Sequence, residues 1–387
     1  MSTPAVPGPP ARSRPDACPG ALQTHPAADG FLARVRVPGG LLTADRLRAL
    51  ARAAAELGDG ALELTSRGNV QLRGLADGTG TELAGRLGAA GLLPSPAHDR
   101  VRNVLASVLT GRAGGLADVR PWVRAVDAGL CTDPRAAELP GRFLVTLDDG
   151  RGDVAGAGGD AGLRVLPGGP VALTLAGRDS GLRCGYEEAP GLVLAAISAF
   201  LDEHAAQGGT AWRLAELADG PRRVAGRLGA TGDLPGAPAA AAGPQPAGEV
   251  RQDDGRTALV AVVPLGRLTA DQAAAVAGVA AEVQLTPWRG VAVPDLDAPA
   301  AAAAALTGAG LVLDPGSPWL RVTACTGRPG CARSLADVRA DAAAAVAAGS
   351  LPAGGARQHW AGCARRCGRP AGDVVDVVAT GGGYRVG

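Results

Sequence analysis

Lysine is absent from this chain of 387 residues, so all 38 of its basic residues are arginines. A lysine can donate a proton or form a Schiff base near neutral pH, whereas an arginine guanidinium keeps its proton throughout that range. No reaction step in this protein can therefore use a lysine as its proton donor or its nucleophile.

A strong net charge is also missing, because 38 basic and 37 acidic residues leave a formal charge of +1. Such a balance produces no global field that would capture a nucleic acid or an anionic membrane surface. We therefore expect neither as a partner. Hydrophobic residues make up 47% of the chain and charged residues 19%, which is typical of a folded globular protein.

The sequence shows no run that reads as a membrane span or a signal peptide. Its most alanine-rich stretch, residues 298–313, contains Pro299 and is flanked by Asp297 and Asp314. Residues 1–15 are rich in proline and alanine but lack an apolar centre. We expect a disordered tail there and a cytoplasmic protein. In that reducing compartment, the seven cysteines are better explained as ligands or buried thiols than as disulfides.

An internal repeat organises the chain. Four segments of the first half return in the same order, at an offset of about 220 residues. The matches are 42–45 with 268–271, 63–68 with 284–290, 90–92 with 309–311, and 116–120 with 335–339. We infer a duplication, in which Cys325 aligns with Ala106, Cys331 with Arg112, and Arg321 with Arg102.

Each repeat opens with the pattern strand, helix, strand, helix. Residues 31–37 alternate apolar and polar side chains as a strand does, and Thr43 can cap a helix that runs to Leu57. Residues 61–72 are again extended, and 81–90 are helical. This alternation predicts a compact α+β unit of the ferredoxin-like type.

The expected fold class is α+β, with two ferredoxin-like units and two larger α+β units related by a pseudo-twofold axis. Because the two halves can pair within one chain, we expect a monomer. The expected segments are a tail (1–15), a ferredoxin-like half-domain (16–96), a larger unit without cysteine ligands (97–225), an Ala/Gly/Pro-rich linker (226–248), a second half-domain (249–318) and a cysteine-bearing unit (319–387).

Four cysteines in the second half carry the clearest chemical signal. Cys325 and Cys331 are separated by five residues, and Cys363 and Cys367 by three. Four thiolates on glycine-bearing loops suit a four-iron four-sulfur (4Fe-4S) cluster, in which each corner iron takes one sulfur. A structural zinc more often has pairs spaced by two to four residues, and remains an alternative, as do four unrelated buried thiols.

The duplicated units and this cysteine pattern resemble the siroheme sulfite and nitrite reductases. The resemblance implies that Cys367 would also bridge the cluster to the siroheme iron. Segments 65–74 and 100–104 are similar to strands that bring arginines to the tetrapyrrole face in that family. Where the reductases carry two lysines for proton delivery, this chain has Arg142 and Leu144.

One branch of this superfamily resembles the chain more closely, namely the precorrin-3B synthases of aerobic cobalamin biosynthesis. The similarity lies in segments 14–20, 64–69 and 359–363. It implies that the tetrapyrrole is the substrate: precorrin-3A would be hydroxylated at C20 with γ-lactone formation, using O2 and an unidentified electron donor. The alternatives are a siroheme-dependent sulfite or nitrite reductase and a non-catalytic iron–sulfur or zinc protein.

Planar guanidinium groups bind carboxylates with two parallel hydrogen bonds, and a precorrin carries many carboxylates on its rim. We expect the substrate to contact arginines in the extended and loop segments that would line the cleft. The spacing of the four histidines indicates no catalytic iron site, so the catalytic residues stay unassigned. The candidate substrate-binding residues are Arg67, Arg73, Arg102, Arg142, Arg289 and Arg321.

Overall fold

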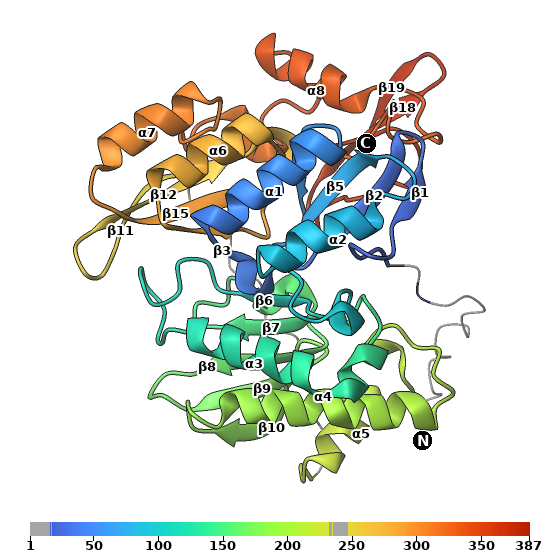
Figure 1. Ribbon diagram of the computed structural model, residues 1–387, viewed down its shortest axis with the longest axis vertical. Coiled ribbons are helices and arrows are strands. Elements are labelled where there is room, and N and C mark those ends of the chain that lie inside the picture. The colour runs from blue at the N-terminus through green and yellow to red at the C-terminus, as the bar shows by residue number, and fades with distance from the viewer. Residues whose placement is uncertain (1–15, 17, 232–233, 235–246) are drawn as a thin grey trace.

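The structure is a computed structural model that describes residues 16, 18–231, 234 and 247–387. It contains four β-sheets with helices packed against them (Figure 1). The predicted tail, residues 1–15, lies outside the described residues, and so does most of the predicted linker at 226–248. No helix in the described ranges is long and apolar enough to cross a membrane.

The first sheet has the strand order β1-β2-β5-β4-β13, and the second has the order β11-β12-β15-β14-β3. Helices α1 (Ala44–Leu57) and α2 (Gly80–Ala89) accompany the first sheet, and α6 (Ala270–Val279) and α7 (Pro299–Gly308) the second. The strands of the first sheet are β1 (His25–Ala27), β2 (Gly30–Val35), β4 (Ala61–Leu64), β5 (Val70–Leu75) and β13 (Arg267–Thr269). Those of the second are β3 (Leu41–Thr43), β11 (Gly248–Arg251), β12 (Thr257–Val262), β14 (Glu282–Leu285) and β15 (Gly290–Leu296).

The two ferredoxin-like units exchange a strand. β13 of the second repeat pairs with β4 of the first, with Leu268 opposite Leu62. In return, β3 of the first repeat pairs with β14 of the second, with Leu42 opposite Val283. One hydrophobic core runs through both units, and α1, α6 and α7 lie side by side in Figure 1. The predicted duplicated α+β architecture is confirmed.

Helix starts at equivalent places in the two repeats are built in the same way. The Thr43 hydroxyl accepts a hydrogen bond from the Arg46 amide at the start of α1, which confirms Thr43 as the N-cap. Thr269 caps α6 similarly, and there Gln272 completes a reciprocal capping box. Each cap satisfies an amide that has no partner within its helix.

The two larger units also share one topology. The third sheet has the order β10-β9-β8-β7-β6, in which β6, β7 and β8 are parallel and β9 is antiparallel. Helices α3 (Arg120–Thr132), α4 (Ala189–Ala206) and α5 (Gly220–Arg227) belong to this unit, which lies below the half-domains in Figure 1. Its strands are β6 (Val104–Ala106), β7 (Val145–Asp148), β8 (Ala161–Val165), β9 (Val171–Leu175) and β10 (Arg178–Cys184).

The fourth sheet repeats this pattern in a shorter form. Strands β16, β17 and β18 are parallel and β19 is antiparallel, and α8 (Val338–Ala347) packs against them. The strands are β16 (Val322–Ala324), β17 (Gln358–Ala361), β18 (Val375–Thr380) and β19 (Gly383–Val386). This unit occupies the upper right of Figure 1, beside β1, β2 and β5.

The register of these sheets corrects the alignment of the repeats. The Ser107 amide donates to the carbonyl of Leu147 beyond the end of β6, and the Cys325 amide donates to that of Trp360 beyond β16. Ser107, rather than Ala106, therefore occupies the position equivalent to Cys325. By the same offset, Arg321 corresponds to Asn103 and not to Arg102. The alignment shifts because the stretch from the matched segment 90–92 to β6 is one residue longer than the stretch from 309–311 to β16.

Candidate functional site

The cysteine loops follow two neighbouring parallel strands. Cys325 comes directly after β16, and Cys363 lies two residues beyond the end of β17. Because the carboxyl ends of parallel strands meet at the same edge of a sheet, the two loops come together. A hydrogen bond of 3.2 Å from the Gly362 amide to Cys325 Sγ joins them.

The other three cysteines of the motif act on the Cys367 thiol. Burial raises the pKa of the Cys367 thiol, and the charges of the other three cysteines raise it further against the opposing effect of Arg365. Those three are Cys325, Cys363 and Cys331. This mutual repulsion is relieved when positive irons bind the sulfurs.

Two glycines are required by the packing and conformation of the cysteine loops. A Cβ at Gly362 would lie 1.8 Å from Ser334 Oγ, and Gly327 has φ +72°, which few other residues adopt. Among the described residues, no three His, Cys, Asp or Glu side chains are arranged to hold a single metal ion. A 4Fe-4S cluster needs one thiolate at each of four separate corners, and four mutually close cysteines on wrapping loops fit that requirement.

A hollow of about 270 Å³, here called the cysteine-side hollow, opens beside Cys325 and Cys367. Its other wall comes from the first repeat, so the two repeats face each other across it. The polar side chains that line it with the two cysteines are Arg34, Glu63, Thr65, Ser66, Gln71, Arg289, Thr326 and Arg339.

A second hollow of about 560 Å³, here called the arginine basin, adjoins the first. Arg34, Gln71 and Thr326 line both. The basin continues over the first repeat and the third-sheet unit. Its remaining polar and aromatic lining is Asp16, Cys18, His25, Arg67, Arg73, Arg142, Trp212 and Arg213.

Strand alternation explains why charged side chains line this cleft. In β2, Ala33 and Val35 point into the core, so Arg34 between them faces the cleft. Gln71 of β5 is opposite Arg34 on one side and opposite Glu63 of β4 on the other. These three residues form a polar row across the sheet, linked by hydrogen bonds from Arg34 Nη2 to Gln71 Oε1 and from Gln71 Nε2 to Glu63 Oε2.

Two of the predicted arginines meet at the arginine basin without a carboxylate partner among the described residues. Arg67 Nη1 donates to the Arg142 carbonyl at 3.1 Å, and the Arg142 guanidinium lies 4.8 Å from the centre of the Trp212 ring. Burial, together with the nearby positive charges of Arg213 and Arg36, lowers the pKa of Arg67 to about 10. A bound anion would compensate this charge.

Arg289 lies at the cysteine-side hollow. Burial lowers the pKa of its guanidinium, and the charge of Arg339 acts in the same direction against that of Glu63. Its Nη2 donates to the Gly368 carbonyl at 3.0 Å, directly after Cys367. Arg289 therefore contributes positive charge next to the cysteine loop.

The remaining predicted arginines have different surroundings. Arg73 lines the basin, but it makes two hydrogen bonds to Asp29, at 2.9 and 2.8 Å, and a third to the Gly330 carbonyl. Arg102 is buried and holds Asp127 through two bonds of 2.7 Å. Neither Arg102 nor Arg321 lines either hollow. The side chains of Arg73 and Arg102 thus stabilise the fold through these contacts.

Several residues of the cleft were missed by sequence reasoning. Arg34 and Gln71 could have been identified from the sequence, because each is a polar residue flanked by core residues within a strand. Arg339 pairs with Glu63 at 2.7 Å, and Arg213 pairs with Asp160 at 2.7 Å. These two pairs join segments distant in sequence, so their place in the cleft depends on tertiary structure.

His359 and Trp360, just before Cys363, are core residues. His359 is fully buried in β17, where its Nδ1 lies 3.0 Å from the Thr323 hydroxyl. Burial lowers the pKa of His359 to about 4, and the charge of Arg289 contributes. Trp360 packs against Tyr384, with ring centres 4.9 Å apart.

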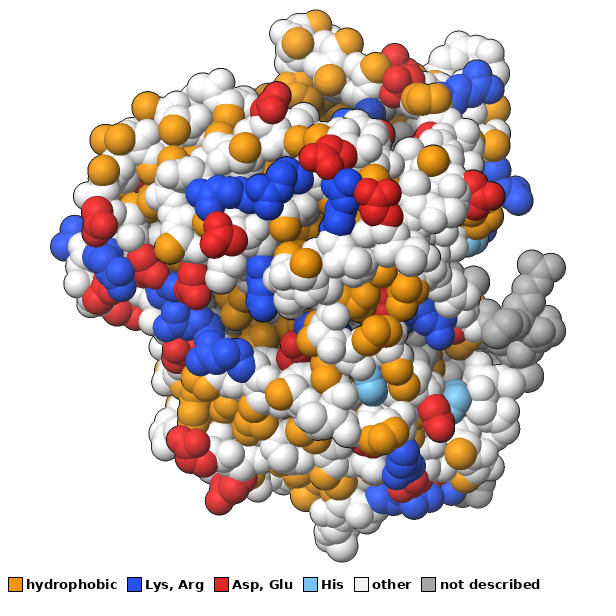
Figure 2. All heavy atoms as spheres, in the orientation of Figure 1, with side chains coloured by type: hydrophobic (Ala, Val, Ile, Leu, Met, Phe, Trp, Pro, Cys, Tyr) orange, Lys and Arg blue, Asp and Glu red, His pale blue; other side chains and the backbone are white. Residues whose placement is uncertain are grey.

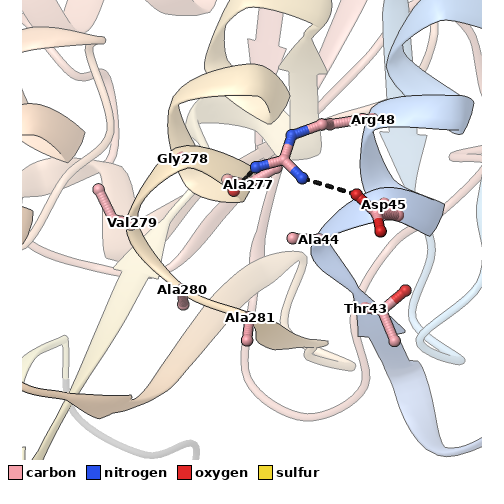
Figure 3. A pocket seen from close by; sticks show the side chains of 9 residues that line it. All are labelled: Thr43, Ala44, Asp45, Arg48, Ala277, Gly278, Val279, Ala280 and Ala281. Atoms are coloured by element: carbon pink, nitrogen blue, oxygen red, sulfur yellow. Dashed lines mark hydrogen bonds and ion pairs between the residues drawn. The ribbon is translucent and has the colours of Figure 1, made fainter.

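A third hollow lies at the seam between the repeats, away from the cysteines. Figure 3 shows the side chain of Arg48 reaching from α1 towards the end of α6. Its guanidinium donates to the Ala277 carbonyl at 2.5 Å and to Asp45 at 2.8 Å. Asp45 and Arg48, the charged side chains of this hollow, therefore serve the packing of the repeats. On the molecular face in Figure 2, arginine and acidic side chains lie next to each other.

Residues 24–90 and 249–305 match the family described as the nitrite/sulfite reductase ferredoxin-like half domain. Precorrin-3B synthase from Sinorhizobium sp. is 28% identical over 97% of this chain and 83% of its own length. Ferredoxin–nitrite reductase from Synechococcus elongatus is 35% identical, over 31% of this chain and 25% of its own.

Among solved structures, the NirA protein of Mycobacterium tuberculosis has the same fold. Its TM-score is 0.73 at 22% identity, over 92% of this chain and 73% of its own. The matched half-domains coincide with the two strand-exchanging sheets. Two segments of the chain therefore match the ferredoxin-like half domain of nitrite and sulfite reductases, and the chain is similar along nearly its whole length to precorrin-3B synthase.

Proposed function

We propose that this protein is a precorrin-3B synthase. It would bind precorrin-3A, hydroxylate it at C20 with O2 and close a γ-lactone. The observation that carries the proposal is the cleft itself, in which an arginine-lined basin adjoins the loops of four cysteines. The similarity to precorrin-3B synthase over 97% of the chain supports the same reaction.

The four cysteines Cys325, Cys331, Cys363 and Cys367 would hold a 4Fe-4S cluster, which supplies single-electron transfer when it is bound. A monooxygenation places one oxygen atom in the substrate and releases the other as water. It therefore consumes two electrons, from a separate donor, and two protons. Arg289 beside Cys367 would stabilise negative charge at this end of the cleft.

The protein's own residues would bind and orient the substrate. Arg67 and Arg142 present guanidinium groups that lack a carboxylate partner in the described structure, and the Trp212 ring supports Arg142 from one side. An anionic macrocycle would restore charge balance in the basin. Holding it at the boundary of the two hollows would bring its edge next to the cysteine loops.

The chain lacks the proton donors that a siroheme reductase would use. The structure places Arg142 in the basin, whereas Leu144 is buried in a hydrophobic cluster with Leu105 and Val154. Neither side chain can deliver a proton to a bound anion. This difference favours the tetrapyrrole as substrate over the tetrapyrrole as prosthetic group.

Turnover tests the proposal. The protein, purified without air and reduced, is mixed with precorrin-3A and then with O2. We expect a product heavier than precorrin-3A by one oxygen atom, labelled when 18O2 is used. Reduction of sulfite or nitrite by the same preparation, together with extractable siroheme, would instead identify a reductase.

A further inference from the structure

Arg34 occupies the passage between the two hollows. Among the described residues, it is the arginine that lines both the arginine basin and the cysteine-side hollow. A ligand that extends from one to the other must therefore pass its guanidinium.

The Arg34 guanidinium is held in place but is not neutralised. Its Nη1 donates to Cys18 Sγ at 3.5 Å and its Nη2 to Gln71 Oε1 at 3.1 Å. Its Nε is buried and has no hydrogen-bond partner. By contrast, Arg73 and Arg213 at the same cleft each pair with an aspartate. A guanidinium can donate along several directions at once, so Arg34 keeps donor capacity for a ligand.

Gln71 is itself fixed. Its Nε2 donates to Glu63 Oε2 at 3.0 Å, so its Oε1 is the atom left to accept from Arg34. One end of the Arg34 guanidinium is thereby set by the polar row across the sheet.

The other end is set by residues that precede the first strand, Asp16 and Cys18 to Gly20, here called the strap. Its Cys18 side chain is buried and accepts from Arg36 Nη2 at 3.2 Å as well as from Arg34. Asp16 ties the strap to the third-sheet unit, because its Oδ2 accepts from the Gly141 amide at 2.5 Å. Cys18 Sγ thus has a position that the backbone determines.

The strap is tightly fitted at its far end. A Cβ at Gly20 would lie 2.1 Å from Asp99 Oδ2. The same Asp99 oxygen accepts from the Ala21 amide at 2.6 Å. A thiol sulfur is a weak hydrogen-bond acceptor. The contacts of Cys18 with two arginines therefore orient the guanidinium groups without neutralising their charge.

We propose that Cys18 is a positioning residue, which holds the Arg34 guanidinium at the passage so that it binds a carboxylate of the anionic ligand. The inference rests on the proposed function for the class of ligand, a carboxylated tetrapyrrole. It adds Arg34 as a contact and the strap as the element that positions it.

The test uses the full-length, cluster-loaded protein and uroporphyrin, a stable porphyrin with eight carboxylates, as the probe. The dissociation constant is measured by titration at fixed ionic strength. Arg34→Gln should weaken binding about tenfold, as expected for the loss of a charge-assisted hydrogen bond. Arg183→Gln is the matched charge control, because Arg183 pairs with Asp179 on the exposed strand β10.

Conservative replacement separates positioning from folding. Cys18→Ala should weaken binding about threefold to fivefold, and Cys18→Ser, whose hydroxyl still accepts a hydrogen bond, should stay within about twofold of the unaltered protein. Cys184→Ala serves as the cysteine control. Iron and sulfide content should be the same in all variants, which shows that the cluster loops are intact.

Three outcomes overturn the inference. Arg34→Gln and Arg183→Gln with equal dissociation constants would remove Arg34 from the site. Unchanged binding in Cys18→Ala would remove the positioning role of Cys18. Failure of the unaltered protein to bind uroporphyrin would overturn the inference and the proposed ligand class together, whereas normal binding with unaffected variants would leave the proposed function standing.

Discussion

At the scale of single residues, the lack of a carboxylate partner in the described structure separates Arg67 and Arg142 from the arginines that hold the fold together. Arg67 is partly buried near other arginines, whereas Arg102 makes two 2.7 Å hydrogen bonds to Asp127. Both lie in sequence segments that resemble the tetrapyrrole-facing strands of the reductases. The sequence could identify the segments, but it could not show which guanidinium already had a carboxylate.

Arg67→Gln and Arg102→Gln should therefore differ in effect. Arg67→Gln should weaken porphyrin binding about tenfold and leave the melting temperature unchanged or higher, because it removes an uncompensated buried charge. Arg102→Gln should destabilise the protein by about 3 kcal/mol, because Asp127 loses its partner. Denaturant unfolding and porphyrin titration of both variants measure this. A binding loss confined to Arg102→Gln would reverse the assignment.

The cluster ligands give a second prediction at this scale. Cys367→Ser should lose iron, acid-labile sulfide and the visible absorption of the cluster, since one corner iron loses its thiolate. Cys131→Ser, at an isolated cysteine of α3, is the control and should retain all three. Full iron and sulfide content in Cys367→Ser would show that another residue completes the site.

At the scale of elements, α4 and α5 are joined by one acidic residue. Glu203 on α4 accepts from Arg223 and from Arg227 of α5, each at 2.6 Å. The hydrogen bond from Arg223 is the largest influence, and with that from Arg227 it lowers the pKa of Glu203 to about 2.

This contact should make stability depend on pH. A carboxyl whose folded-state pKa is depressed contributes stability above its unfolded value of about 4.5 and loses it as the pH falls towards 2. Glu203→Gln should cost about 2 kcal/mol at pH 7, with the difference from the unaltered protein shrinking below pH 4. Unfolding free energies measured from pH 7 to pH 3 test this. A difference that stays constant over that range would contradict it.

Strand exchange is the feature of the secondary structure that local sequence patterns could not predict. The repeat and the helices of each unit were readable from periodicity and capping residues such as Thr43, whereas the extended stretch predicted at 61–72 is two antiparallel strands, β4 and β5. The short strands β3 and β13 were not predicted, because which sheet a three-residue strand joins depends on the other repeat. The one-residue error in the alignment of Cys325 has the same origin, since only the register of β6 and β16 fixes it.

The exchange predicts a single unfolding unit. Leu268 of β13 is fully buried opposite Leu62 in the other repeat, so Leu268→Ala should cost about 2–5 kcal/mol. Because one core serves both half-domains, the two should still unfold in one transition. Leu335→Ala, at a side chain that is 51% exposed, should cost less than about 0.5 kcal/mol. Separate transitions for the two halves would contradict the shared core.

At the scale of the whole molecule, duplication yields two similar halves, of which the second carries the four cysteines of the motif. The first repeat has Ser107 at the position of Cys325, and the Gln284 side chain donates to the carbonyls of Gly39 and Ser107. The cysteine motif alone predicts that the second half holds the cluster. The cleft between the halves, and the residues of the first repeat that complete it, required the tertiary structure.

The central claim is that the cysteines hold a cluster and that the tetrapyrrole is a substrate. The most direct test is an absorption spectrum of protein purified without air, combined with iron and acid-labile sulfide assays and a siroheme extraction. The account predicts about four irons and four sulfides per chain and no siroheme. Stoichiometric siroheme in the purified protein would contradict it and would favour a siroheme-dependent reductase.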